Sequence, residues 1–414
     1  MIRIMLIMLL LAPLCGAWAQ QASFTALLAA GKAEFKKEYE QQNFRAAVAA
    51  LEAAVQLQPA NPEAHYFLGY AYSRLNSKSG GDLPRRSATL VLKTSREMEL
   101  VSRLAPRYAG ELLALDPYGK LTGEWGALAL AYATRHEPDS VQWAYAQGRQ
   151  RGGFDDFLLG NARAVLDQCH PGSILLTPGD LVTFPVLYLQ LHQGYRRDVS
   201  VLDVGLLASD WYPAYLEQAT SLRFGLAPAE RDTMAFLPWR TGLASLPNAR
   251  RKNLFKWKVY PTLDSTYLQR SDLLALMLLR NNAFQRDVYF THAFRWEDQL
   301  GLRQGQELLQ RLVVYLVNAD REPELPFAQY QTGMEAILKN LTVSVNPNSR
   351  DEREMVQTLR YDVLDRINAS IAHHRPAEVK PLLAFIERYV PEASYPFVPD
   401  SDEKKYYDYV RSLP

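Results

Sequence analysis

The stretch ILLTPGDLVTFPVLYLQ, residues 174–190, decides the fold of the middle of the chain. Residues 173–177 form a short apolar run that predicts a buried strand, and the Pro-Gly pair after it predicts a sharp turn. The next apolar run predicts a helix to about Gln193, in which Thr183 can cap the first turn. Residues 199–204 (VSVLDV) then predict a second strand. A strand, a helix and a strand in this order form a β-α-β unit, which implies parallel strands and a right-handed crossover.

Three further segments extend this unit into a larger α/β domain. Residues 271–282 predict a helix, and residues 287–294 and 311–317 predict a third and a fourth strand. The strands are continuous apolar runs, which is typical of parallel strands buried on both faces. We therefore expect a small Rossmann-like parallel α/β domain over residues 169–318. The long connection at 221–266 is expected to be a lid or a partner-binding segment.

Polar residues cluster where the predicted strands end. In sheets of this kind, ligands bind beyond the carboxyl ends of the strands. The candidate ligand-binding residues there are Thr177, Gly179, Asp180, Asp210, Trp211 and His292. Two interpretations stay open. Either these residues form a polar pocket with Asp180 at its centre, or Asp180 and Asp210 bond to backbone N–H groups of their own turns and helix starts.

The front of the chain has apolar and small residues at the spacing that is typical of paired helices. In residues 43–76, small residues fall where two helices must approach closely, and large residues fall between them. This pattern resembles the tetratricopeptide repeat, and residues 121–154 resemble a second, weaker unit. The residues expected to pack these helices are Ala47, Leu51, Ala54, Pro59, Leu68, Gly69, Tyr72, Trp125 and Tyr132. Stacked helix pairs form a concave surface, so the resemblance implies a protein partner.

The two ends of the chain predict a leader and a helical tail. Residues 1–19 combine one Arg, a short apolar run and an Ala-x-Ala pattern, which predicts a secretory signal peptide and a mature start near Gln20. The helical front then spans residues 20–168. Residues 319–414 form a C-terminal segment with amphipathic helical spacing. We expect an exported, periplasmic protein with no membrane span in its mature part.

Composition and motifs exclude several classes of protein. Lys and Arg number 46 against 45 Asp and Glu, so no excess of positive charge favours a nucleic acid as partner. Beyond the leader, Cys169 is the single Cys, and we expect it to be packed rather than nucleophilic. The sequence has no complete catalytic motif and no metal ligands at short spacing. We therefore expect no catalytic residue, no cofactor and no metal.

Residues 174–218 also resemble a known family. The matching residues, in order, are Gly179, Asp180, Thr183, Phe184, Pro185, Tyr188, Leu189, Gln190, Arg197, Asp198, Val199, Leu206, Leu207, Asp210, Trp211 and Tyr212. They resemble the extracytoplasmic region of bacterial membrane proteins that are similar to protein O-mannosyltransferases. A second matching block lies at 267–290, and the resemblance covers about 153–318. The front and middle together are also similar to exported tetratricopeptide proteins of the Bacteroidetes type.

Two departures limit what this resemblance implies. The family turn continues Gly-Asp-Asn-Asp, whereas apolar Leu181 and Val182 follow Asp180 here. The membrane half, which carries the catalytic acid in that family, has no counterpart in this sequence. The resemblance therefore implies a fold and an extracytoplasmic location, and it argues against the transferase reaction in this chain alone.

Two functions are compatible with these patterns. The first is an exported, non-enzymatic binding or scaffold protein of the bacterial cell envelope that acts through its tetratricopeptide-like repeats. The alternative is a glycan-binding or accessory subunit of a membrane protein-glycosylation system of the O-mannosyltransferase-like kind. In that case Asp180, Asp210 and Trp211 are expected to touch sugar.

Overall fold

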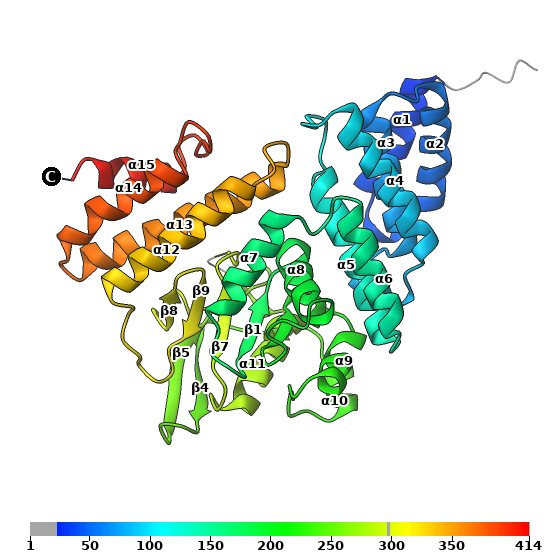
Figure 1. The fold of residues 1–414 in the computed structure, drawn as a ribbon. Helices are drawn as coiled ribbons and strands as arrows, with labels where there is room; N and C mark the ends of the chain where they lie inside the picture. The colour runs from blue at the N-terminus through cyan, green and yellow to red at the C-terminus, as the bar shows by residue number, and fades with distance from the viewer. Residues whose placement is uncertain (1–22, 296–298, 414) are drawn as a thin grey trace, which may run out of the picture.

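The computed structural model describes residues 23–295 and 299–413, and the predicted signal peptide lies outside these ranges. Figure 1 shows a helical front, a central α/β unit and a group of helices at the C-terminal end. This architecture confirms the predicted fold class, which combines tetratricopeptide-like helices, a small α/β unit and a helical C-terminal segment.

The helical front is built from successive helix pairs. Its helices are α1 (Phe24–Lys36), α2 (Phe44–Leu57), α3 (Pro62–Asn76), α4 (Ala88–Leu104), α5 (Pro117–Thr134) and α6 (Pro138–Gln150). The side chains of Asn43 and Asn61 each accept a backbone N–H at the start of α2 and α3, which fixes where these helices begin. The buried members of the predicted packing set are Ala47, Leu51, Ala54, Leu68, Gly69, Tyr72 and Trp125. Pro59 is exposed at the end of its helix, and Tyr132 is half-buried.

The central sheet has five strands in the order β2-β1-β7-β9-β8. They are β1 (Ile174–Thr177), β2 (Ser200–Asp203), β7 (Val288–Thr291), β8 (Leu308–Arg311) and β9 (Val314–Val317). β1 runs parallel to β2 and β7, as predicted, but β9 runs antiparallel to β7. The expectation of a parallel fourth strand over 311–317 is therefore wrong. Only Leu312 and Val313 join β8 to β9, and so short a connection can join only antiparallel strands.

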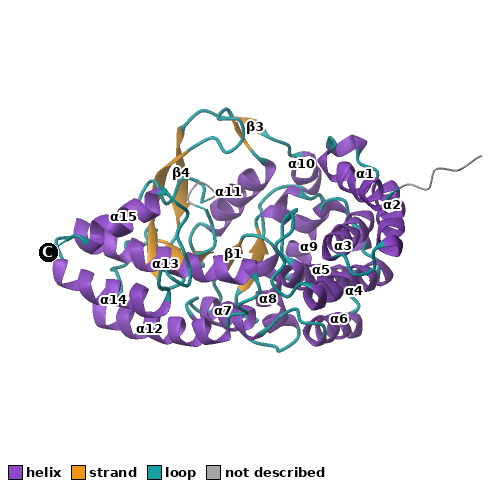
Figure 2. Ribbon diagram, turned by 90° about the horizontal axis from the view of Figure 1, so that it is seen from above, coloured by secondary structure: helices purple, strands orange, loops and turns teal. Residues whose placement is uncertain are grey.

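The reversal of strand order around β1 indicates where a ligand could bind. α8 (Asp180–Leu191) leads from β1 to β2, and α11 (Arg270–Asn282) leads into β7 on the other side of β1. Figure 2 shows α11 across the sheet from α8 and from α7 (Asp156–Asp167). Such a reversal opens a crevice at the carboxyl ends of the two strands beside it. Here those ends are Thr177 of β1 and Thr291 of β7.

The long connection before α11 folds into small elements of its own. Within the predicted range 221–266 they are α10 (Pro228–Thr233), β3 (Leu237–Pro238), β4 (Gly242–Asn248) and β5 (Asn253–Val259). The helix α9 (Trp211–Ala219) precedes this range, and β6 (Tyr267–Leu268) follows it. β4 and β5 form an antiparallel hairpin. Along β5, buried Phe255, Trp257 and Val259 alternate with exposed residues, so that one face of the hairpin packs on the core.

Both helical parts reach the carboxyl edge of the sheet. The C-terminal helices are α12 (Phe327–Ser344), α13 (Arg350–Ala372), α14 (Val379–Tyr389) and α15 (Asp402–Arg411). α5 packs on α8 so closely that a Cβ atom on Gly126 would lie 2.3 Å from Cγ of Phe184. The starts of α5 and α13 meet where the backbone N–H of Asp116 donates to Oδ2 of Asp351, at 2.8 Å (Figure 1). Among the residues that the structure describes, no helix is both long and apolar enough to cross a membrane.

Candidate functional site

A buried carboxylate organises the turn after β1. Asp203, the last residue of β2, accepts hydrogen bonds from the backbone N–H of Gly179 (3.0 Å), from Oγ1 of Thr183 (2.5 Å) and from the N–H of Leu206 (2.9 Å). Thr177 joins this group through a 2.7 Å contact between its Oγ1 and that of Thr183. Burial raises the pKa of Asp203 to about 6, although its hydrogen bonds oppose the shift. Thr183 therefore serves the turn by donating to Asp203 and is not the cap of α8, whose N-cap is Gly179.

Asp180 lies at the junction between α8 and the helical front. A Cβ atom on Gly123 of α5 would lie 2.8 Å from Oδ2 of Asp180, so that the carboxylate faces that helix even though the residue is exposed overall. Loss of hydration raises the pKa of Asp180, and the nearby charges of Lys120 and Arg86 oppose this rise. No side-chain cap hydrogen bond occurs at the start of α8, and Asp180 therefore does not cap its own helix.

Asp210 and Trp211 lie at the start of α9, where that helix meets the front. Nε1 of Trp211 donates to the carbonyl oxygen of Gly80 at 2.8 Å. The Asp210 side chain is 85% exposed and pairs with Arg270 at 3.3 Å. The Trp211 indole nitrogen is thus used in a contact between the two parts of the protein, and the Asp210 carboxylate faces solvent.

His292, which directly follows β7, lines a cavity of about 640 Å³ between the sheet edge, α13 and α15. The other predicted site residues do not line this cavity. Its polar wall includes Arg303, Tyr315, Asp362 and Asp365. The carboxyl edge is therefore divided, because α5 covers it near Asp180 and α13 covers it near His292.

The cavity wall has the chemistry of a polar-ligand site. Nδ1 of the buried His292 lies 3.0 Å from Oδ2 of Asp362, and its Nε2 has no hydrogen-bond partner among the described residues. The Tyr315 hydroxyl lies within hydrogen-bond distance of Asp362 (3.0 Å) and Asp365 (2.7 Å), but it has only one proton to donate. Burial raises the pKa of Asp365, and its contact with Arg303 opposes this. Such a wall offers both donors and acceptors to a bound molecule.

Aromatic side chains complete the same cavity. Phe294, Tyr361 and Tyr406 line it beside the carboxylates. The hydroxyl of Tyr406 is buried and, like Nε2 of His292, has no partner among the described residues. Buried polar groups normally have a hydrogen-bond partner, so these two atoms leave hydrogen-bonding capacity unused beside the cavity.

The turn held by Asp203 gives a testable expectation for stability. Asp203→Asn is expected to lower the free energy of unfolding by about 1–3 kcal/mol, because the amide NH₂ would face donors that now bond to a carboxylate. Asp180→Ala is the matched control and is expected to cost less, since its carboxylate caps nothing. Urea unfolding of both variants measures the difference, and a larger loss for Asp180→Ala would contradict this account of the turn.

Comparisons with known proteins match one segment of the helical front and one segment of the central α/β unit. A tetratricopeptide repeat matches at residues 36–76, which include α2 and α3. The family described as TMEM260-associated domain 2 matches at residues 159–221, which run from α7 through β2 to α9. That match ends before the second predicted block at 267–290. No curated protein and no solved structure matches the chain. The repeat suggests a protein-binding scaffold.

Some residues of the carboxyl edge escaped the sequence analysis. Asp362 and Asp365 are three positions apart on α13, so that they share a helix face, but their pairing with His292 depends on a contact between distant segments. Asp203 was visible as an acid at the end of a predicted strand. Thr183, in the first turn of the helix that precedes this strand, was the signal that could have marked Asp203 as a hydrogen-bond acceptor for the turn.

Proposed function

We propose that this protein is an exported, non-enzymatic scaffold of the bacterial cell envelope that binds a protein partner through its tetratricopeptide-like front. The observation that carries this proposal is a groove of about 620 Å³ at the matched repeat, where the start of α2 faces the end of α3. Its charged residues are Glu40, Arg45, Arg74, Lys78, Asp82 and Arg85. Four cations against two acids make this basic groove suited to an acidic segment of the partner.

Charge reversal in the basic groove tests the proposal. The double variant Arg45→Glu/Arg85→Glu changes two exposed side chains, so that the fold should be retained. We expect partner affinity to fall at least tenfold, and more at low salt, because an acidic partner would now meet like charges. The measurement is co-purification of the tagged protein from its native envelope, followed by titration of the recovered partner.

A matched control separates this effect from a general change of charge. Arg280→Glu/Lys339→Glu makes the same change in charge on α11 and α12, at exposed positions far along the chain from the repeat. It is expected to leave the affinity unchanged. If both double variants bind the partner as tightly as the unmodified protein, the basic groove is removed from the proposal. If both lose affinity by the same factor, the loss points to non-specific electrostatics.

The cavity at His292 favours a second candidate function, a glycan-binding accessory of a membrane protein-glycosylation system. Sugars present many hydroxyl groups and an apolar ring face, which suit carboxylates, an imidazole and aromatic rings in one cavity. The same co-purification, analysed for glycans as well as proteins, tests this candidate. His292→Ala is expected to abolish glycan recovery and to leave the protein partner bound, whereas unchanged glycan recovery would exclude the cavity as its binding site.

A further inference from the structure

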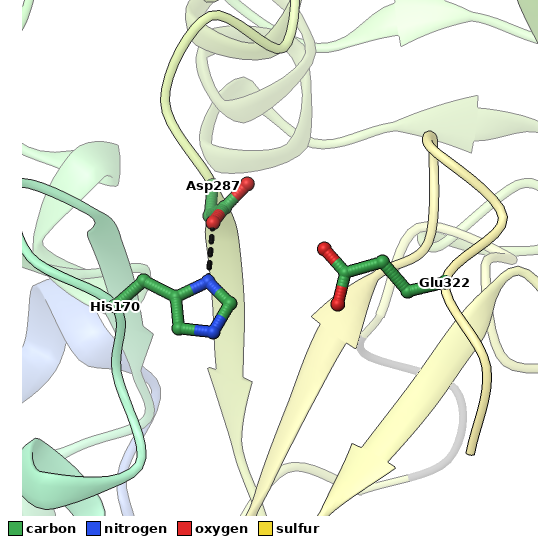
Figure 3. A group of neighbouring side chains, drawn as sticks. All are labelled: His170, Asp287 and Glu322. Atoms are coloured by element: carbon green, nitrogen blue, oxygen red, sulfur yellow. Dashed lines mark hydrogen bonds and ion pairs between the residues drawn. The ribbon is translucent and has the colours of Figure 1, made fainter. Parts of the chain in front are cut away.

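Three potential metal ligands meet at the amino edge of the sheet, opposite the edge described above. His170 lies in the loop before β1, Asp287 directly precedes β7, and Glu322 follows β9. Because β9 is antiparallel to β7, the end of β9 lies beside the start of β7. One ligand atom from each of these three residues lies within 4.8 Å of the other two. Figure 3 shows the Glu322 carboxylate pointing toward the His170–Asp287 pair, whose Nδ1 and Oδ2 atoms are 2.6 Å apart.

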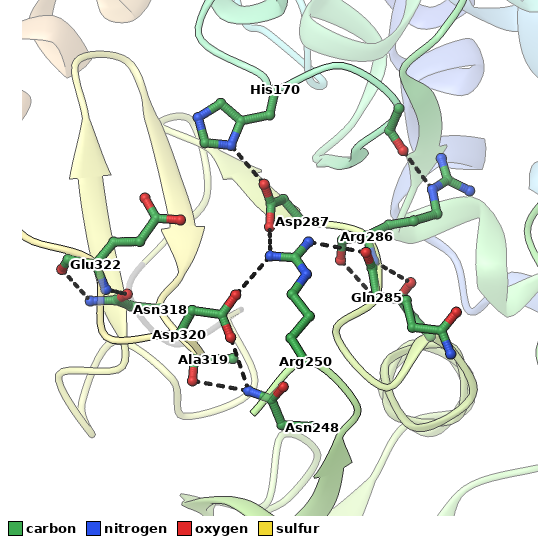
Figure 4. A network of polar contacts seen from close by, with 12 residues as sticks. His170, Asn248, Arg250, Gln285, Arg286, Asp287, Asn318, Ala319, Asp320 and Glu322 are labelled. Atoms are coloured by element: carbon green, nitrogen blue, oxygen red, sulfur yellow. Dashed lines mark hydrogen bonds and ion pairs between the residues drawn. The ribbon is translucent and has the colours of Figure 1, made fainter. Parts of the chain in front are cut away.

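An arginine binds one oxygen of each of the two carboxylates, those of Asp287 and Glu322. Nη1 of Arg250 binds Oδ1 of Asp287 at 2.6 Å, while Oδ2 of that residue faces His170. Nη2 of Arg311 binds Oε2 of Glu322 at 2.6 Å. Figure 4 shows Arg250 between Asp287 and Asp320. Arg250 also donates to Oδ2 of Asp320, at 2.7 Å. Outer partners of this kind orient metal-binding carboxylates and leave one oxygen of each for an ion.

The backbone around Glu322 is fixed as well. Oδ1 of Asn318 accepts the backbone N–H of Glu322 at 2.6 Å, and Nδ2 of Asn318 donates to the carbonyl oxygen of Glu322 at 3.1 Å. This pair of bonds closes a small loop after β9. The backbone that carries the Glu322 side chain is therefore fixed before an ion binds, which reduces the loss of conformational entropy on binding.

Charge and access both favour a cation. Asp287, Asp320 and Glu322 carry three negative charges against two positive charges on Arg250 and Arg311. The His170 side chain is 51% exposed. A cavity of about 690 Å³, lined by His170 and Glu322 among others, opens on this edge and leaves room for water ligands.

We propose that His170, Asp287 and Glu322 bind one divalent transition-metal ion of the Zn²⁺ class, with water completing its coordination. An imidazole nitrogen with two carboxylate oxygens suits Zn²⁺, whereas Mg²⁺ and Ca²⁺ prefer shells made of oxygen alone. On binding, the ion replaces the hydrogen bond between Nδ1 of His170 and Oδ2 of Asp287, so that His170 would bind it through Nδ1 as the neutral tautomer with its proton on Nε2, and any further proton is released to water. The ion would tie three separate segments together at this edge.

This site is independent of the proposed scaffold function. The sequence indicated no metal site because no two of the three ligands are close in the chain, and short spacing is what marks metal ligands in a sequence. The alternative is that the cluster is complete as it stands, as a network of ion pairs around Arg250 and Arg311. The two possibilities differ in whether the protein binds Zn²⁺ with defined stoichiometry through His170 and Glu322.

The test is calorimetric titration of the untagged protein, stripped with EDTA, with ZnCl₂. We expect one ion per chain with micromolar affinity, and a rise in melting temperature of roughly 2–4 °C at saturation. MgCl₂ at the same concentrations is expected to give no saturable binding. His170→Asn and Glu322→Gln are each expected to weaken Zn²⁺ binding at least tenfold while the metal-free protein melts as the unmutated protein does.

His373→Asn is the matched control, because His373 is also an exposed imidazole beside a carboxylate, that of Glu324 at 3.2 Å. It is expected to bind Zn²⁺ normally. No saturable Zn²⁺ binding, or binding that both His170→Asn and Glu322→Gln retain, would overturn the proposal and leave the cluster as a network of ion pairs. If either ligand variant also lowers the melting temperature of the metal-free protein, the titration is repeated on Glu322→Asp, which keeps the charge, and tenfold weaker binding is again the expected result.

Discussion

Glu124→Gln is expected to lower the free energy of unfolding by about 3–5 kcal/mol at pH 7. The Glu124 side chain is 1% exposed and pairs with Arg86 at 2.9 Å and with Lys120 at 2.8 Å. Burial opposes its ionisation, but the two cations outweigh burial and lower the pKa of Glu124 to about 2. Removing this negative charge would leave two buried cations without a counter-charge, and that is the costly way to break a buried ion pair.

Lys120 limits how large this cost becomes. Burial lowers the pKa of its ammonium group, although Glu124 opposes this. Without Glu124, Lys120 can release its proton and avoid part of the penalty, whereas Arg86 cannot. We therefore expect the lower half of the range, with a further loss of stability as the pH falls and Lys120 is forced to stay charged.

Equilibrium unfolding in urea measures the effect, and Glu137→Gln is the control. Glu137 pairs with Arg135 at 3.0 Å on the surface, where its side chain is 42% exposed. Exposed pairs contribute little, so this change is expected to stay within about 0.5 kcal/mol. A loss for Glu124→Gln no larger than that of the control would mean that the buried network does not stabilise the packing of α5 within the helical front.

Local patterns in the sequence were sufficient for the parallel half of the sheet. The run from Ile174 to Gln190 contains a whole strand, a turn and most of a helix, so its structure depends on neighbours in the chain. The direction of β9 depends instead on the two-residue turn at Leu312 and Val313, inside a run that was interpreted as one apolar strand. An apolar run indicates burial but does not indicate direction.

The candidate site was harder to predict because segments far apart in the chain, α5 and α13, cover the carboxyl edge of the sheet. The rule for parallel sheets pointed to the carboxyl edge, and it placed His292 among the candidates. It could not indicate that α5 covers one half of that edge through Gly119, Gly123 and Gly126, which appear in the sequence only as small residues. The partner of His292, Asp362, comes from a helix that the sequence assigned to a different domain.

The helices α5, α7 and α13 start close together, and the acidic residues at their starts are expected to make stability depend on pH. Asp116 caps α5 through the N–H of Gly119, and its Oδ2 accepts from the Ser349 hydroxyl at 2.7 Å and from the N–H of Asp351 at the start of α13. Glu352 also lies buried at this junction and contacts Asp155, the N-cap of α7. Four carboxyl groups thus gather around the starts of α5, α7 and α13.

Burial and neighbouring acids favour the protonated form of two of these groups. Burial, together with the charge of Asp116, raises the pKa of Asp351 to about 7. Burial, together with the hydrogen bond to Asp155, raises that of Glu352 to about 9. Because the folded state holds these protons more tightly than the unfolded chain, their contribution to stability is complete below about pH 4 and is lost as the pH rises through 7 and towards 9.

Unfolding measured from pH 5 to pH 9 is therefore expected to show stability that falls as the pH rises, by up to about 1.4 kcal/mol per pH unit for each of these two groups. Glu352→Gln should flatten the upper part of this fall, because the amide oxygen can still accept the N–H of Asn346 and its NH₂ can still donate to Asp155. Asp351→Asn should flatten the part around pH 7. Glu387→Gln, which alters an exposed ion pair with Arg411 between α14 and α15, should leave the slope unchanged. If all three variants follow the slope of the unmodified protein, the acids at this junction are ionised in the folded state, and the contact between α5 and α13 must be held by the capping bonds alone.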